Sequence, residues 1–114
     1  MTINEAIAEA RRNRPTAQDD EVLAPMLRVV DDEIAEMMGV TPQDFLYPEI
    51  DYELLMPAPH DRIYPLYLEG QIDLYNQETG LYANDAEIYN NAMSEAKAWY
   101  RRHNRPTRNI NWRI

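Results

Sequence analysis

The 114-residue chain contains no cysteine, three glycines and no long apolar run. The absence of cysteine excludes disulfide bonds, thiolate zinc sites and a cysteine nucleophile. Three widely separated glycines cannot build a glycine-rich phosphate loop. No segment has the apolar length of a signal peptide or of a membrane span. We therefore expect a soluble, single-domain protein that is made inside the cell and has no membrane partner.

Residues with catalytic chemistry are also scarce. His60 and His103 each lack a histidine or carboxylate three or four residues away, the spacing of a helical metal pair. Ser94 is the only serine, and no nucleophile-elbow sequence surrounds it. Glu69 and Asp73 have the i, i+4 spacing of a carboxylate pair that acts as acid and base or binds a hard cation. Because the chain has 20 acidic residues, such pairs arise by chance. We predict that the protein is not an enzyme and holds no metal or cofactor.

Charge is distributed unevenly along the chain. Residues 1–95 hold all 20 acidic residues and five of the 11 basic ones, a net charge of −15, whereas residues 96–114 hold six basic residues and no acidic one. This asymmetry indicates a basic segment that docks on an acidic surface. The candidates for that surface are the chain's own body, a neighbouring copy, another protein and nucleic acid. The alternative to docking is an ordinary basic terminus surrounded by solvent. The acidic body argues against specific binding to a DNA duplex.

Apolar periodicity predicts a mainly α fold with helices over about residues 2–12, 19–38, 61–75 and 85–102. Local signals support the ends of the first two. Thr2 and Glu5 have the spacing of a capping box, and Gly39 suits a helix end. Pro25 predicts either a kink in the second helix or a separate first turn.

The last two helices are predicted to form a hairpin, and the linking regions are rich in proline. We place the hairpin break at Gly80 and Asn84, with one continuous helix over residues 61–102 as the alternative. Residues 40–60 hold four of the eight prolines, which indicates a long loop. We thus expect a small bundle of about four helices in residues 1–103 and an extended basic arm in residues 104–114.

Aromatic residues of the second half are predicted to pack in the seam of this hairpin or in a subunit interface, rather than to bind a ligand. A tyrosine buries its ring and leaves its hydroxyl to find a partner, which suits both locations. The residues are Tyr64, Tyr67, Tyr75, Tyr82, Tyr89 and Trp99. On the polar side of the second helix, we expect a solvated acidic face made of Asp31, Asp32 and Glu36.

The stretch ELLMPAPHDRIYPLYLEGQIDLYN, residues 53–76, resembles a signature of head-tail connector (adaptor or neck) proteins of long-tailed phages and prophages. Their pattern is roughly ELL-x-PAP-x-D, then Y-x-x-YLEAQIDY, a YNN turn, an aromatic–asparagine pair and a Y-x-R ending before a proline. Here it falls on Glu53–Asp61, Tyr64–Leu74, Tyr82–Asn84, Tyr89–Asn90 and Tyr100–Arg102 with Pro106. The chain departs from the pattern at Gly70, Ala83 and Asn104, where alanine, asparagine and histidine are expected.

The resemblance implies a helical subunit of a homo-oligomeric ring, usually twelvefold, in the virion neck. Its partners would be neighbouring copies, the portal protein and a tail-side connector or stopper protein, with DNA passing through the channel without being held. The acidic face would then point to this channel or to solvent. The charge reversal predicts an arm that binds a neighbouring subunit or the portal through Arg101, Arg102, Arg105, Arg108, Trp112 and Arg113.

Two alternatives stay open. The chain is another small head- or tail-completion protein, or it is a free-standing acidic module that binds a basic protein partner.

Overall fold

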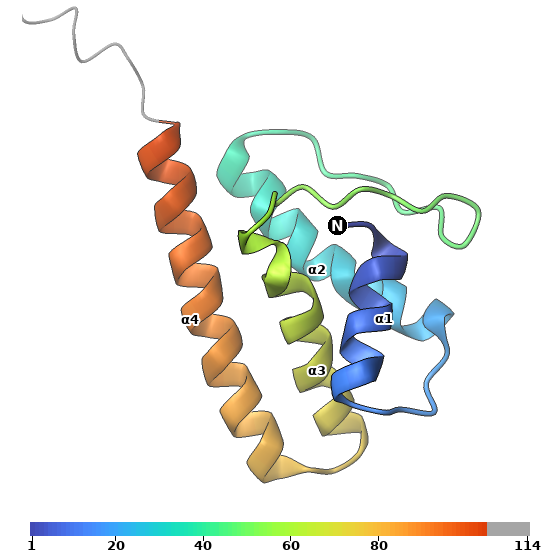
Figure 1. The fold of residues 1–114 in the computed structure, drawn as a ribbon. Helices are drawn as coiled ribbons and strands as arrows, with labels where there is room; N and C mark the ends of the chain where they lie inside the picture. The colour runs from blue at the N-terminus through green and yellow to red at the C-terminus, as the bar shows by residue number, and fades with distance from the viewer. Residues whose placement is uncertain (105–114) are drawn as a thin grey trace, which may run out of the picture.

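The computed structural model describes residues 1–104, and Figure 1 shows their fold. These residues form four α-helices and a short 3-10 helix, in the order α1 (Ile3–Asn13), α2 (Asp20–Met38), η1 (His60–Arg62), α3 (Ile63–Tyr75) and α4 (Thr79–His103). The extended pairing within this part of the chain is limited to one isolated bridge between Thr2 and Glu53. The predicted mainly α bundle of about four helices is therefore confirmed. Of the predicted arm, all residues after Asn104 lie outside the described part.

The ends of α1 and α2 follow from local sequence signals. Thr2 accepts a hydrogen bond from the backbone of Glu5, and the Glu5 side chain bonds back to Thr2, which completes the predicted capping box. Gly39 ends α2 in the left-handed conformation with φ 72°, where a side chain would be strained. Helix α2 runs continuously through Pro25, so the alternative of a separate first turn is wrong.

The break between α3 and α4 lies at Asn76–Glu78, and the prediction at Gly80 and Asn84 is wrong. The turn is made without glycine, because Gln77 itself adopts φ 60°. Backbone N–H groups of residues 76–78 donate to carbonyls of residues 72–74, which closes the C-terminal end of α3. Gly80 and Asn84 are consequently part of α4, which begins six residues earlier than predicted.

Helices α1, α2 and α3 surround the apolar core, and α4 lies along the outer side of α3, away from α1 (Figure 1). The core is rich in side chains of α2 and α3, namely Leu23, Leu27, Val30, Ile34, Ile63, Tyr64, Leu68 and Ile72. The long loop before α3 crosses one end of the bundle and inserts Leu54 and Met56 into the core. By contrast, the buried side chains of α4 are Asp85, Ala92, Met93 and Ala96. Over the described residues, no helix combines the length and the apolar character that crossing a membrane requires.

Candidate functional site

The seam between α3 and α4 holds a buried ionic cluster at the end nearest the turn. Arg14, which follows α1, reaches both helices of the hairpin. Its Nε lies 3.1 Å from Oδ1 of Asp73 on α3 and 3.1 Å from Oδ2 of Asp85 on α4. Its Nη2 donates to Oδ1 of Asp85 at 3.1 Å. Asp73 is 1% exposed and Asp85 3% exposed, so one guanidinium links α1, α3 and α4 in a water-poor setting.

This Arg14 cluster contains more negative than positive charge. Glu69, also buried, accepts a hydrogen bond from Asn13 at 3.1 Å, and its charge adds to those of Asp73 and Asp85, the two carboxylates paired with Arg14. One oxygen of Asp73, Oδ2, is buried without a hydrogen-bond partner. Burial, reinforced by the hydrogen bond and charge of Asp85, raises the pKa of Asp73 from 3.8 to about 6. Burial likewise raises the pKa of Glu69. The cluster therefore takes up a proton more readily than free carboxylates do.

The sequence singled out two members of this cluster and missed the others. The i, i+4 pair Glu69 and Asp73 does lie together, but Asp85 and Arg14 come from distant parts of the chain and carry no local signal. Within residues 1–104, no group of three or more candidate ligands is arranged to hold a metal ion.

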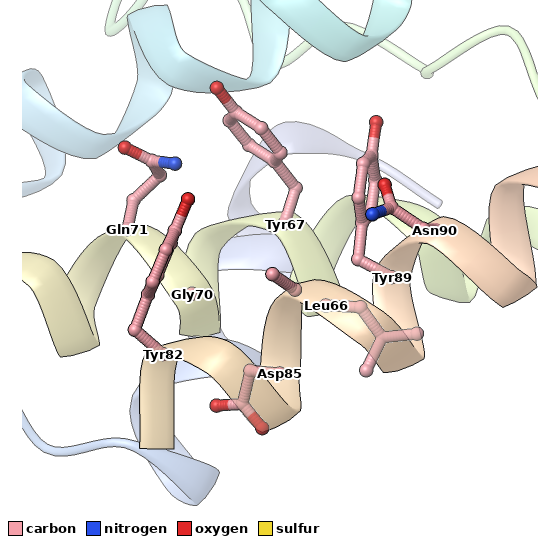
Figure 2. Close-up of a pocket in the computed structure, with 9 residues that line it drawn as sticks. Leu66, Tyr67, Gly70, Gln71, Tyr82, Asp85, Tyr89 and Asn90 are labelled. Carbon is pink, nitrogen blue, oxygen red and sulfur yellow. The ribbon is translucent and has the colours of Figure 1, made fainter. Parts of the chain in front are cut away.

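A small pocket lies beside the cluster, between the facing sides of α3 and α4. Its volume is about 180 Å³, and its lining includes Leu66, Tyr67, Gly70, Gln71, Tyr82, Asp85, Ala86, Tyr89 and Asn90. Figure 2 shows the rings of Tyr67, Tyr82 and Tyr89 standing on one side of the hairpin, with Gly70 below and between Tyr67 and Tyr82. Asp85 points away from the rings in this view. We call this space the tyrosine pocket.

Gly70 lies in the lining of the tyrosine pocket and adds no side chain to fill it. A Cβ at this position would lie 3.9 Å from two atoms of the Tyr82 ring, an ordinary van der Waals distance. In the pocket lining, the Tyr67 and Tyr89 rings pack against each other with centroids 5.2 Å apart and a tilt of 59°, a favourable arrangement for two aromatic rings. Burial raises the pKa of the Tyr67 and Tyr89 hydroxyls, so both stay protonated.

The other aromatic residues predicted for the seam are placed differently. Tyr64 is fully buried in the core, and its hydroxyl donates to Asp31 on α2 at 2.7 Å. Tyr75 is 58% exposed and lies outside the seam, at the end of α3. Trp99 lies between His60 of η1 and His103 of α4, at ring-centroid distances of 5.1 and 5.0 Å. It thereby ties the C-terminal end of α4 to the start of α3.

The predicted acidic face is wrong for Asp31. Its side chain is 1% exposed, because it shares the inward side of α2 with Leu27 and Ile34. Besides the Tyr64 hydroxyl, it accepts hydrogen bonds from the backbone N–H of Leu55 at 2.9 Å and from the Gln43 side chain at 3.1 Å. Asp31 is thus a structural link that fixes the long loop to α2 and α3.

The other two residues of that predicted face lie at the surface. Asp32 is partly exposed and pairs with Arg28 at 3.5 Å, and Glu36 is exposed.

The basic segment begins on α4 and partly docks on the chain's own body. Lys97 pairs with Glu33 of α2 at 2.5 Å, while Arg101 and Arg102 are exposed in the last turn of α4. The remaining predicted arm residues, Arg105, Arg108, Trp112 and Arg113, lie outside the described residues. Comparison of this chain with models of known protein families, with curated proteins and with solved structures finds no match.

Proposed function

We propose that this chain is a head-tail connector (adaptor) subunit of a phage virion, which forms a ring between the portal and the tail through which DNA passes. The observation that carries the proposal is the basic C-terminal end of α4. Arg101 and Arg102 are exposed in its last turn, and three further arginines follow in residues 105–114 of the sequence. A basic segment at the end of an otherwise acidic chain suits binding to an acidic neighbour.

The resemblance of residues 53–106 to connector proteins supplies the kind of assembly. In that assembly the partners are neighbouring copies in a ring of about twelve, as the resemblance implies, together with the portal protein and a tail-side connector or stopper. DNA contacts the ring only in passing, because an acidic surface repels phosphate and does not retain the duplex. Asp32 and Glu36 are the predicted acidic residues that stay available for such a surface.

Deletion of residues 104–114 tests the proposal in phage assembly. We expect heads and tails that form but do not join, because the neighbour-binding segment is lost while the four helices are kept. A matched pair of full-length variants separates charge from length: Arg101→Glu with Arg102→Glu should block joining, whereas lysine at both positions should preserve much of it. Normal assembly of the truncated protein on portals would contradict the proposal.

The alternative of a free-standing acidic module predicts a different behaviour in solution. Light scattering with negative-stain imaging distinguishes them: rings or portal-bound collars support the connector, and a monomer under all conditions supports the module. Locating the chain in the particle separates the connector from another completion protein.

A further inference from the structure

We propose that the Arg14 cluster is a pH-dependent latch for the first half of α4. When Asp73 carries a proton, it hydrogen-bonds to Asp85 and the α3–α4 seam is closed. When that proton is lost, residues 79–91 separate from α3 more often. The inference goes beyond the proposed function, because it concerns a movement within one chain.

The hydrogen bonds of the cluster are complete only when Asp73 carries a proton. The Nε–H group of Arg14 is shared by Oδ1 of Asp73 and Oδ2 of Asp85, each 3.1 Å away, so the two carboxylates are neighbours. The other oxygen of Asp73, Oδ2, is buried without a hydrogen-bond partner, which is destabilising. A proton turns this oxygen into a donor, and the Asp85 carboxylate is the acceptor beside it. One proton therefore satisfies the unpaired atom and removes the repulsion between the two carboxylates.

The charges around Asp73 favour this proton. One guanidinium, that of Arg14 at the end of α1, bonds to its carboxylate. The acidic residues on the elements packed around it are Glu9 of α1, Glu69 of α3, Glu78 of the turn and Asp85 of α4. Burial, together with the hydrogen bond and charge of Asp85, raises the pKa of Asp73 from 3.8 to about 6. The proton is consequently lost as pH approaches neutrality, and not in strong acid.

The packing of α4 confines the effect to its first half. Between Thr79 and Asn91, Asp85 is the one buried side chain of α4, and Arg14 holds it through two hydrogen bonds. The second half packs independently of the cluster, through the buried apolar side chains of Ala92, Met93 and Ala96. Loss of the proton leaves two carboxylates on one guanidinium at the attachment of the first half. Residues 79–91 therefore open while the second half stays packed, and the opening uncovers the buried side of α3 at Gly70 and Asp73.

Hydrogen exchange of the full-length protein at about pH 5 and about pH 8 tests the latch. Each rate is compared with the intrinsic rate of an unprotected amide at the same pH. With a pKa of 3.8 in the open form and about 6 in the closed form, opening of residues 80–91 should become about tenfold more frequent between the two conditions. Low urea concentrations identify a local opening, because they promote global unfolding and hardly change the exchange of a small segment.

Two variants separate the latch from other effects of pH. Asp73→Asn has a neutral side chain at every pH, so residues 80–91 should keep the wild-type protection of about pH 5 and retain it at about pH 8. Glu87→Gln removes an exposed carboxylate from the same half of α4 and should behave like the wild type. In the wild type, an NMR titration of the Asp73 carboxyl carbon should have its midpoint near pH 6.

Three results would overturn the inference. The first is equal protection of residues 80–91 at both pH values in the wild type, and the second is an equal fall in Asp73→Asn. The third is exchange of these residues only through global unfolding that urea accelerates. None of these measurements involves a partner, so the latch can fail while the connector function, tested by deletion of residues 104–114, stands.

Discussion

Replacing Asp73 with asparagine should stabilise the fold at neutral pH, although Asp73 is a partner of Arg14. The carboxylate is 1% exposed, accepts one hydrogen bond from Arg14 at 3.1 Å and leaves its other oxygen buried without a partner. An asparagine keeps an acceptor oxygen for Arg14. Its amide group turns two N–H donors toward Asp85 in place of a second negative charge. The substitution therefore removes the repulsion between the carboxylates of residues 73 and 85 and gives the buried, unpaired atom of residue 73 a hydrogen-bond partner.

The pKa of Asp73 sets the size and the direction of this effect. Its value rises from 3.8 to about 6 in the folded protein, so between these pH values the folded state binds more protons than the unfolded chain. The free energy of unfolding consequently falls as pH increases from about 4 to about 6. A shift of roughly two units corresponds to about 3 kcal/mol lost at pH 7. This figure already includes the attraction of Arg14, which lowers the pKa of Asp73, so the expected gain of the neutral asparagine at pH 7 is about 3 kcal/mol.

Urea unfolding followed by circular dichroism from about pH 4 to about pH 8 measures this difference. The free energy of unfolding of the wild-type protein should fall over that range, whereas that of Asp73→Asn should change little with pH. Asp85→Asn is the matched control: it weakens two hydrogen bonds from Arg14 and should destabilise by about 2 kcal/mol at pH 7. A destabilised Asp73→Asn protein at pH 7, or an unchanged pH slope, would refute the reasoning.

Two further substitutions test the seam and the core. Gly70→Ala should raise the free energy of unfolding by about 1 kcal/mol and the melting temperature by about 4 °C. The reasons are that alanine favours helix and that its Cβ would contact the Tyr82 ring at 3.9 Å. A lower melting temperature would show that the pocket floor tolerates no methyl group. Asp31→Ala should destabilise by about 3 kcal/mol, since it leaves a buried tyrosine hydroxyl and a backbone N–H without an acceptor. Asp32→Ala, at the partly exposed neighbouring position, should change the free energy of unfolding by less than about 0.5 kcal/mol in the same urea titration.

Features decided by neighbouring residues were predictable from the sequence. The capping box of Thr2 and the left-handed Gly39 are local devices, and the structure contains both. The α3–α4 turn failed as a prediction because Gln77 adopts a positive φ, which side chains other than glycine seldom do. Asp31 was assigned to the wrong side of α2, although its spacing from Leu27 and Ile34 on the buried stripe pointed inward.

Features assembled from distant segments could not be predicted from the sequence. Arg14 meets Asp73 and Asp85 across 59 and 71 residues of chain, and no periodicity encodes such a contact. The tyrosine pocket illustrates a mixed outcome. Of the tyrosines predicted for the seam, Tyr67, Tyr82 and Tyr89 line the pocket, whereas Tyr75 is exposed at the end of α3.

The Arg14 cluster also determines the shape of the tyrosine pocket, because Asp85 belongs to both. Between Thr79 and Asn91, Asp85 is the one side chain of α4 that is buried, and the apolar contacts of α4 begin at Ala92. The position of Tyr82 and Tyr89 relative to Tyr67 therefore depends on the bonds from Arg14. Asp85→Asn should lower the protection of backbone amides in the first half of α4 against hydrogen exchange, whereas Asp73→Asn, which keeps those bonds, should leave it intact. Equal protection in both variants would show that the pocket forms independently of the cluster, and that α4 is positioned by its C-terminal half alone.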